Sequence, residues 1–508
     1  MKQDLVIGLD SSTTATKAIA WNAGGRAIAE GRAAISLHTP KPGWFEQDVG
    51  DWTGAAAKAL KQLALKIDMA RVGAIAISNQ RESFAQFDKN DKALRPGTLW
   101  LDERAHLEAK ELAQSLGAEN LHRISGKPSD VTPCITRCRW LAKNMPSIWK
   151  KTAMTAEVHG VLTNFLSGQW HTSTASADPM GLLDMQHYDW SDELVGAVGL
   201  TRSQLPRLFR PGDVMGEVTP AAAKLTGLKT GTLVVAGGGD GQCAGTGANT
   251  FVKGRAYLNL GTAAVSGSFG KTYEHDPVFR TMSAVAEEGY SYETAIRTGT
   301  FLVNWMVERL FNVDARKNPQ IFMQLEKEAM ASPVGSNGIV LVPYWSGCMT
   351  PYWDPKARGV IAGLSGNHSR GDVYRAILEG IALEQVMMTN GVAAATQPID
   401  HFVIMGGGAR SNFWCQIVAD AAGWDVRRLE TVEASSLGAA IAAAKGAAWF
   451  KSIPDASAAM SGKSSKVFRP RSKQHKTYTE LMKLYRELWP MMSRWNARLQ
   501  DFTGDQPK

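Results

Sequence analysis

Short apolar runs, separated by polar turns, open the chain. Leu5–Leu9 is an apolar run that ends at Asp10, and a second run, KAIAW, follows the small hydroxylated segment SSTTAT. The turn residues Asn22–Gly25 then lead into a third run at Arg26–Arg32. Runs of this length bounded by turn residues predict three strands joined by two turns, of which the first is large enough for a phosphate.

A helical pattern follows these strands. Between Val49 and Leu65 the apolar residues recur three and four positions apart, which predicts an amphipathic helix. The continuous apolar run Val72–Ser78 then predicts a buried strand. A polar loop, Asn79–Glu82, comes directly after that strand.

The second half of the chain repeats this order of elements. Thr232–Ala236 predicts a strand that ends in three glycines and Asp240. Arg255–Leu260 predicts another, followed by Gly261-Thr262, and Ala263–Phe269 predicts the strand after it. The repetition indicates a duplicated architecture.

Strands and helices also alternate towards the C-terminus. His401–Met405 predicts a strand that runs into three glycines, and Ser411–Ala422 predicts a helix. A long amphipathic helix over Lys473–Leu499, interrupted at Pro490, closes the chain. Alternating strands and helices favour an α/β fold. We expect two domains, residues 1–250 and 251–508, which pack closely across a cleft.

Composition excludes several classes of protein. Of 508 residues 44% are apolar and 20% charged, which excludes wholesale disorder. The net charge of +8 is mild and no dense basic run is present, so we expect no nucleic-acid partner. No apolar run has the roughly 18 residues of a membrane helix. Five scattered cysteines and a start unlike a signal peptide predict reduced thiols in a cytoplasmic protein.

Two strand ends carry candidate phosphate and metal chemistry. Asp10 ends an apolar strand, where a carboxylate is costly unless it has a partner such as Mg²⁺, and the small residues after it allow phosphate to approach. Gly261-Thr262 holds the matching place in the second half. Together the two loops could grip a polyphosphate from both sides, whereas each alone is also typical of a plain turn.

Two glycine-rich segments could approach a ligand closely. Asp240 follows three glycines and suits a general base that accepts a hydroxyl proton, although a helix N-cap is an equal alternative. Gly406-Gly407-Gly408 lies between a strand and a helix and could hold an adenosine. No Walker loop and no dinucleotide fingerprint occurs, which argues against a P-loop enzyme and an NAD-dependent oxidoreductase.

The loop after Val72–Ser78 is a candidate substrate loop. Arg81 and Glu82 offer donors and acceptors for adjacent hydroxyls, with a surface ion pair as the alternative. Aromatic residues beside polar groups, as in Trp100-Leu101-Asp102, are also typical of sugar recognition.

In this order the motifs resemble those of the FGGY carbohydrate kinases, and among them the xylulokinase-like branch. The resemblance covers about Leu5 to Trp449 and rests on segments such as IGLDSSTTATKAIAWN, AGGGDGQCAGTG, LNLGTAAVSG and MGGGARSNFWCQIVADAAG. It implies two ribonuclease H-like domains of the actin and hexokinase type that close on ATP, Mg²⁺ and a sugar. The N-terminal domain would bind the sugar and carry the first phosphate loop, and the C-terminal domain would bind ATP.

The resemblance assigns roles to particular residues. Asp240 would be the catalytic base, and Asp10 and Asp240 would hold the metal. The expected nucleotide-binding residues are Thr13, Thr14, Lys17, Gly261, Thr262, Gly406, Gly407, Gly408, Ser411 and Asn412. The expected substrate-binding residues are Gln80, Arg81, Glu82, Trp100, Asp102, Asp240 and Gln242.

The substrate stays open at this point. Xylulokinase-like chains carry Met-His where this one has Arg81-Glu82, a pair similar to that of glycerol kinases. We therefore expect an ATP-dependent kinase of a ketopentose such as xylulose, or of another ketose or a polyol such as glycerol. A non-catalytic actin-like ATPase or sugar sensor is the alternative from another class. We also expect a homodimer, with neither a nucleic-acid nor a membrane partner.

Overall fold

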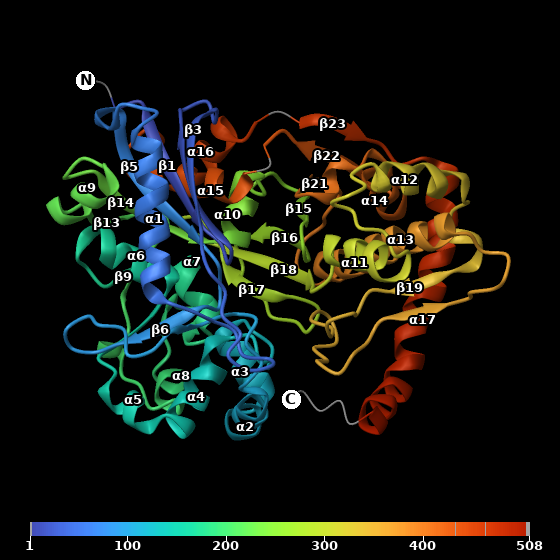
Figure 1. The fold of residues 1–508 in the computed structure, drawn as a ribbon, viewed down its shortest axis with the longest axis horizontal. Helices are drawn as coiled ribbons and strands as arrows, with labels where there is room; N and C mark the ends of the chain where they lie inside the picture. The colour runs from blue at the N-terminus through green and yellow to red at the C-terminus, as the bar shows by residue number, and fades with distance from the viewer. Residues whose placement is uncertain (1–2, 432, 463, 504–508) are drawn as a thin grey trace.

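Two mixed β-sheets, one in each half of the chain, organise the molecule (Figure 1). The structure is a computed structural model that describes residues 3–431, 433–462 and 464–503. The strand order in the N-terminal sheet is β13 (Val214–Glu217), β14 (Leu233–Gly239), β5 (Val72–Asn79), β1 (Leu5–Ser11), β2 (Ala15–Trp21) and β3 (Ala27–Ala34). The order in the C-terminal sheet is β17 (Arg280–Ser283), β18 (Tyr290–Ile296), β16 (Ala264–Gly270), β15 (Arg255–Leu260), β21 (His401–Met405), β22 (Asp425–Leu429) and β23 (Ser464–Phe468).

The two sheets share one topology. In the first, β1 pairs antiparallel with β2 and parallel with β5, and β5 is parallel to β14. In the second, β15 pairs antiparallel with β16 and parallel with β21, and β21 is parallel to β22. The predicted duplication and the α/β class are therefore confirmed.

Alternation along β1 distributes its side chains between two cores. Leu5, Ile7 and Leu9 pack with α1 (Val49–Ala64) and α6 (Val158–Ser167) on one face of the sheet. On the opposite face, Val6 packs with α15 (Ala434–Gly446), a helix from the far end of the chain. Figure 1 shows α15 beside the blue strands β1 and β5. The C-terminal half thus completes the core of the N-terminal sheet.

A glycine in β1 allows this close approach. A Cβ at Gly8 would lie 1.9 Å from the carbonyl oxygen of Ser436, so any other residue would push the helix away. The hydroxyl of Ser436 donates a hydrogen bond to the carbonyl of Gly8 at 2.9 Å. This contact fixes the position of α15 just after Glu433.

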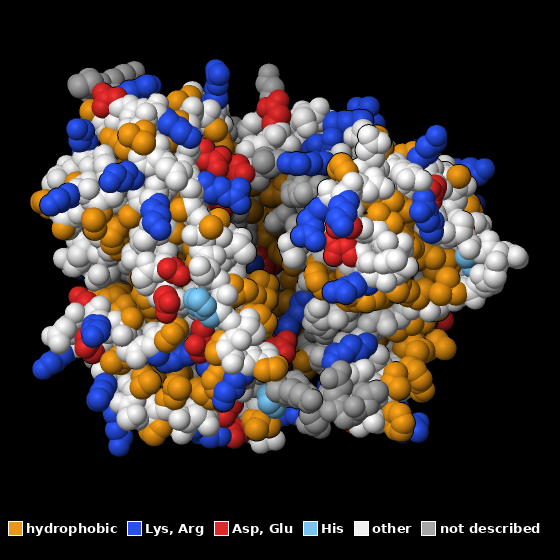
Figure 2. Space-filling model, viewed as in Figure 1, with side chains coloured by type: hydrophobic (Ala, Val, Ile, Leu, Met, Phe, Trp, Pro, Cys, Tyr) orange, Lys and Arg blue, Asp and Glu red, His pale blue; other side chains and the backbone are white. Residues whose placement is uncertain are grey.

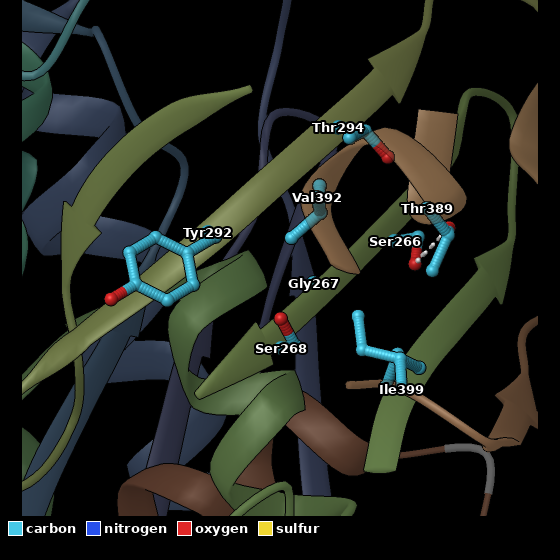
Figure 3. A pocket seen from close by; sticks show the side chains of 9 residues that line it. Ser266, Gly267, Ser268, Tyr292, Thr294, Thr389, Val392 and Ile399 are labelled. Carbon is cyan, nitrogen blue, oxygen red and sulfur yellow. Dashed lines mark hydrogen bonds between the residues drawn. The ribbon is translucent and has the colours of Figure 1, made fainter. Parts of the chain in front are cut away.

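Helices also cover the C-terminal sheet. The long helix α13 (Arg370–Ala395) packs on β16 and β18, and α14 (Asn412–Ala422) follows β21. Figure 3 shows the seam between α13 and the sheet, where the hydroxyls of Ser266 and Thr389 are 3.3 Å apart. The space among these side chains is too narrow for a water molecule, so the seam is packed core.

The last helix, α17 (Ser472–Thr503), differs from its prediction. It runs through Pro490, where the sequence predicts an interruption. Trp489 is buried and packs edge-on against Tyr344 at 4.9 Å, so contacts with the body of the protein stabilise the helix at that point. No helix in the described part of the chain has the length and apolar character that a membrane span needs.

The five cysteines are buried free thiols, and burial raises the pKa of Cys134 to about 12.

In the N-terminal half the other strands are β4 (Glu46–Gln47), β6 (Phe84–Phe87), β7 (Gly97–Thr98), β8 (Met154–Glu157), β9 (His171–Ser173), β10 (Leu183–Asp184), β11 (Asp189–Trp190) and β12 (Arg207–Phe209). The other helices there are α2 (His106–Leu116), α3 (Ala118–Ser125), α4 (Cys134–Asn144), α5 (Pro146–Lys151), α7 (Thr174–Ala177), α8 (Asp192–Ala197), α9 (Pro220–Thr226) and α10 (Asp240–Gly247). In the C-terminal half they are α11 (Thr300–Trp305), α12 (Ile321–Ala331), α16 (Ile453–Met460), β19 (Val340–Val342) and β20 (Val360–Ala362).

Candidate active site

A groove runs between the two halves of the molecule, and charged atoms are visible at its floor (Figure 2). Asp10 lies at the end of β1, and its Oδ1 accepts a hydrogen bond from the hydroxyl of Ser78 at 2.7 Å. Burial raises the pKa of Asp10 to about 7, and the negative charge of Asp240 adds to this rise. The hydrogen bond from Ser78 lowers the pKa and offsets only part of it. Two carboxylates that interact in this way suit a divalent cation.

Asp240 is the first residue of α10, at the end of β14. Its Oδ1 accepts a hydrogen bond from the backbone N–H of Gly241 at 2.8 Å and lies 3.0 Å from Nε of Arg81. The side chain is 41% exposed, so one oxygen is fixed while the carboxylate stays open to the groove. The N-cap of α10 is Gly239, so the N-cap alternative for Asp240 is wrong. The exposed carboxylate is compatible with a general base.

Arg81 belongs to a chain of five charged side chains that we call the charge chain: Asp240, Arg81, Glu293, Arg280 and Glu82. Nη1 of Arg81 lies 2.8 Å from Oε2 of Glu293. Arg280 lies 2.6 Å from the other oxygen of Glu293 through Nη2, and 2.8 Å from Glu82 through Nη1. The chain therefore joins the substrate loop to β17 and β18 of the C-terminal sheet.

The charge chain is buried and ionised at its centre. Burial alone would raise the pKa of Glu293, but Arg81 and Arg280 outweigh it and hold the pKa at about 2. Burial would lower the pKa of Arg81, yet the neighbouring Glu293, Asp240 and Glu82 raise it well above its usual value. The pKa of Glu82 is raised, because burial outweighs Arg280 and Arg81.

A buried arginine fixes the substrate loop. Arg137 on α4 donates from Nη2 to the carbonyls of Glu82 at 2.7 Å and Thr132 at 2.6 Å, and from Nη1 to the carbonyl of Leu99. Glu82 has a φ of 50°, which a β-carbon disfavours, so this anchor offsets local strain. Arg81 and Glu82 are 9% and 6% exposed, and they pair with Glu293 and Arg280 of the C-terminal half. The alternative interpretation, a surface ion pair between Arg81 and Glu82, is therefore wrong.

The other predicted substrate residues lie around this loop. Gln80 donates to Oε1 of Gln47 at 3.0 Å, and Gln242 donates to Oδ1 of Asp178 at 3.1 Å. The indole N–H of Trp100 donates to the hydroxyl of Thr13 at 2.9 Å, which links the aromatic side chain to the first phosphate loop.

Asp102 lies deeper inside the protein. Its Oδ2 accepts from the backbone N–H of Phe45 at 2.8 Å, and both of its oxygens accept from Arg104. The guanidinium of Arg104 stacks 3.8 Å from the ring of Trp44. Both oxygens of Asp102 therefore have partners within the protein.

Lys17, in the candidate first phosphate loop, forms an ion pair with Glu433 from the C-terminal half of the chain. It pairs with Asp10 in the β1–β2 register, and its Nζ lies 2.6 Å from Oε2 of Glu433. Thr13 is half-buried and Thr14 is exposed on the turn beside it. Glu433 precedes α15, so the helix that completes the N-terminal core also places a carboxylate at this loop.

A pocket of about 260 Å³ lies beside the second phosphate loop. Thr262 lines it together with Thr300, Phe301, Asn304 and Trp305 of α11 and with Glu308 and Arg309 of the following π-helical turn. The N–H groups of Thr300 and Gly299 donate to the carbonyls of Gly261 and Thr262 at 2.8 and 2.7 Å, so the loop and the start of α11 are one unit.

The third glycine-rich segment joins β21 to α14. Gly406 has a φ of 88°, and a Cβ there would lie 2.4 Å from Oδ1 of Asn259. A Cβ at Gly407 would meet no atom within 4 Å, so this backbone is open to a ligand. Ser411 caps α14 by accepting from the N–H of Trp414 at 2.9 Å, and Asn412 accepts from Arg428 at 2.9 Å.

Sequence reasoning missed three charged residues of the site: Arg280, Glu293 and Glu433. Glu293 is the one charged residue of the predominantly apolar and hydroxylated strand β18, where a lone charge is costly unless it has a partner. Arg280 lies in β17, whose only apolar residue is Met282, so the signal there is weaker. That cost is a usable signal, although it does not identify the partner. Glu433 lies in a polar segment and carries no comparable signal.

Comparison with solved structures defines the class of fold. A xylulose kinase and a gluconate kinase from Lactobacillus acidophilus each match with a TM-score of 0.91 at 24% identity, over 97% of this chain and 99% of theirs. The protein thus has the two-domain α/β fold of the actin and hexokinase type.

Sequence comparison identifies the family. The FGGY family of carbohydrate kinases, N-terminal domain, matches residues 5–247, and the C-terminal domain of that family matches residues 242–447. A xylulose kinase from Staphylococcus epidermidis is 28% identical over 99% of this chain and its own full length. The chain belongs to the FGGY family of carbohydrate kinases, as the order of motifs predicts.

Proposed function

We propose that this protein is an ATP-dependent kinase that phosphorylates a terminal hydroxyl of a ketopentose such as xylulose. Full-length similarity to proteins named xylulose kinase supports the substrate. The observation that carries the chemistry is the carboxylate of Asp240, fixed through Oδ1 by Gly241 and Arg81 and open on its other side.

In this proposal Asp240 orients the substrate hydroxyl and accepts its proton. Phosphoryl transfer needs mainly positioning and charge neutralisation, so the base contributes by aligning the attacking oxygen. Arg81 keeps Asp240 in one rotamer through the 3.0 Å contact with Nε. Arg81 and Glu82 bind substrate hydroxyls from the same loop, with Gln80, Trp100, Asp102 and Gln242 around them as further proposed substrate residues.

The residues present fit ATP and Mg²⁺. Asp10 and Asp240 supply carboxylates of the kind that Mg²⁺ prefers. Burial and the charge of Asp240 raise the pKa of Asp10, and the nearby Lys17 offsets only part of that rise, so a further cation would stabilise the ionised carboxylate. ATP supplies the phosphoryl group, and Mg²⁺ neutralises negative charge on the phosphates. We propose that Thr13, Thr14, Lys17, Gly261 and Thr262 contact the phosphates and that Gly406, Gly407, Gly408, Ser411 and Asn412 hold the adenosine.

A coupled assay of ADP release tests the proposed function. Xylulose, other pentuloses, hexuloses, gluconate, glycerol and tetritols are each supplied with ATP and Mg²⁺. We expect the highest kcat/KM with xylulose. A higher value with another ketose or with glycerol would move the substrate to that class, which the Arg81-Glu82 pair supports as the second candidate. ATP turnover that no sugar stimulates would contradict a kinase.

Three further expectations remain proposals. We propose a homodimer, which size-exclusion chromatography with light scattering tests, and a cytoplasmic location, which fractionation tests. We also propose the division into domains at about residue 250. The two family matches support it, since they overlap at residues 242–247.

A further inference from the structure

The charge chain combines residues from both halves of the protein. Asp240, Arg81 and Glu82 come from the N-terminal half, while Arg280 on β17 and Glu293 on β18 come from the C-terminal half. Arg280 lies opposite Glu293 in the antiparallel register of these two strands. The strand pairing therefore delivers one positive and one negative charge to the substrate loop as a preformed unit.

Each guanidinium in the chain already contacts two carboxylates. Arg81 lies 3.0 Å from Asp240 and 2.8 Å from Glu293, and Arg280 lies 2.8 Å from Glu82 and 2.6 Å from Glu293. Three carboxylates face two guanidiniums, which gives the fully ionised chain a net charge of −1. Arginine is the side chain that most often binds a carboxylate in two-point geometry, but here both arginines are engaged with the protein.

Glu293 is the centre of this arrangement. It is 1% exposed, accepts from both arginines and also accepts from the hydroxyl of Tyr257 at 3.1 Å. Its low pKa keeps it charged at neutral pH. Without that charge, Arg81 and Arg280 would each keep one carboxylate partner, and the chain would be neutral.

We infer that Glu293 determines specificity: by neutralising Arg81 and Arg280 it makes the site select an uncharged polyhydroxylated substrate and reject a sugar acid. This inference rests on the proposed function and names the class of substrate more closely. A sugar acid would add a fourth carboxylate to a site in which both guanidiniums are already paired with carboxylates of the protein. A neutral sugar needs only hydrogen bonds, and the carboxylate oxygens of the charge chain can still accept them from sugar hydroxyls.

The test compares xylulose with gluconate in the wild type and in Glu293→Gln. The substitution keeps the size of the side chain and an oxygen for Tyr257 but removes the charge. We expect the ratio of kcat/KM for xylulose to that for gluconate to fall by about ten- to a hundredfold, mainly through a lower KM for gluconate, because a charged hydrogen bond becomes available. The matched control is Glu288→Gln, an exposed residue just before the same strand, which should leave the ratio unchanged.

Wild-type inhibition provides a test that does not depend on a folded variant. Gluconate and the neutral six-carbon polyol of the same length are compared as competitive inhibitors against xylulose. We expect the inhibition constant of gluconate to be at least about tenfold higher than that of the polyol. Equal inhibition constants would overturn the inference, and so would an unchanged ratio in a folded Glu293→Gln variant.

The outcomes separate this inference from the proposed function. Wild-type preference for xylulose with an unchanged ratio in Glu293→Gln overturns the inference and leaves the proposed function intact. Turnover of another neutral sugar instead of xylulose overturns the proposed substrate, and the same ratio, measured with that sugar, then decides the inference. Wild-type preference for gluconate overturns both.

Discussion

Nε of Arg81 lies 3.0 Å from Oδ1 of Asp240, so the substrate loop directly holds the carboxylate that we propose as the base. The two residues are 159 positions apart in the chain. Because α10 begins at Asp240, the N–H of Gly241 fixes the same oxygen from the other side. The residue that we propose for substrate recognition therefore also holds the proposed base in place.

Asp240→Asn should lower kcat by roughly 10²–10⁴-fold while the fold is retained. The amide oxygen of asparagine can still accept from Arg81 and Gly241, so the loss reports the proton acceptor rather than the geometry. Steady-state kinetics with the sugar and a thermal melt measure the two effects. Asp192→Asn, at an exposed position on α8, is the matched control. Nearly full activity in Asp240→Asn would remove this residue from the mechanism.

Arg81→Ala and Glu82→Ala should each raise the KM for the sugar more than about tenfold, because unpaired polar groups shaped for hydroxyls are costly. Arg81→Ala should in addition lower kcat, since Asp240 loses its partner. The KM for ATP should change little in both. Arg202→Ala, which breaks an exposed ion pair with Asp189 and Asp192, should have no kinetic effect. An unchanged sugar KM in both loop variants would place recognition elsewhere.

Local pattern was sufficient for much of this fold, because strand alternation and turn chemistry are properties of neighbouring residues. The strands Leu5–Ser11 and Arg255–Leu260 are examples: the pattern predicts that the first ends at Asp10, one residue early, and that the second ends at Leu260, as it does. Pro490 is a contrary example: its local effect predicts a break, but the packing of Trp489 on Tyr344 stabilises the helix through it.

Pairing between distant segments could not be predicted. Arg81 and Glu82 are visible in the sequence as a candidate substrate loop, but their partners lie about 200 residues later on β17 and β18. A single sequence does not show which buried charged residues form ion pairs with each other. The same holds for α15, which packs on the N-terminal sheet although it lies more than 350 residues after β1 and β5, two of the strands that it covers.

Thr262→Val should raise the KM for ATP by roughly tenfold with little change in the KM for the sugar, because it removes one hydroxyl from the pocket beside the second phosphate loop. Valine keeps the shape of the side chain, so the contacts of Gly261 and Thr262 with the start of α11 should persist. Isothermal titration with a non-hydrolysable ATP analogue measures the effect directly. Unchanged affinity for the analogue would exclude the hydroxyl of Thr262 from nucleotide binding.

Glu384→Gln should stabilise the protein at alkaline pH and not at acidic pH. Glu384 on α13 is buried and accepts from the hydroxyls of Tyr344 at 2.7 Å and Tyr485 at 2.5 Å. Burial raises its pKa from 4.5 to about 7, against the effect of these two hydrogen bonds. The folded state therefore favours the protonated carboxyl, and this contribution to stability is complete below about pH 4.5 and lost as the pH rises through 7.

A neutral glutamine avoids that loss. Its amide N–H can donate to Tyr485, whose own hydroxyl already lies 3.4 Å from the carbonyl of Gly380. At pH 8 we expect the free energy of unfolding of the variant to exceed that of the wild type by up to about 3 kcal/mol, since one pKa unit corresponds to about 1.4 kcal/mol. Urea unfolding at pH 5 and pH 8 measures the difference, with Glu487→Gln at an exposed position of α17 as the control. An equal difference at both pH values would show that ionisation of Glu384 does not govern it.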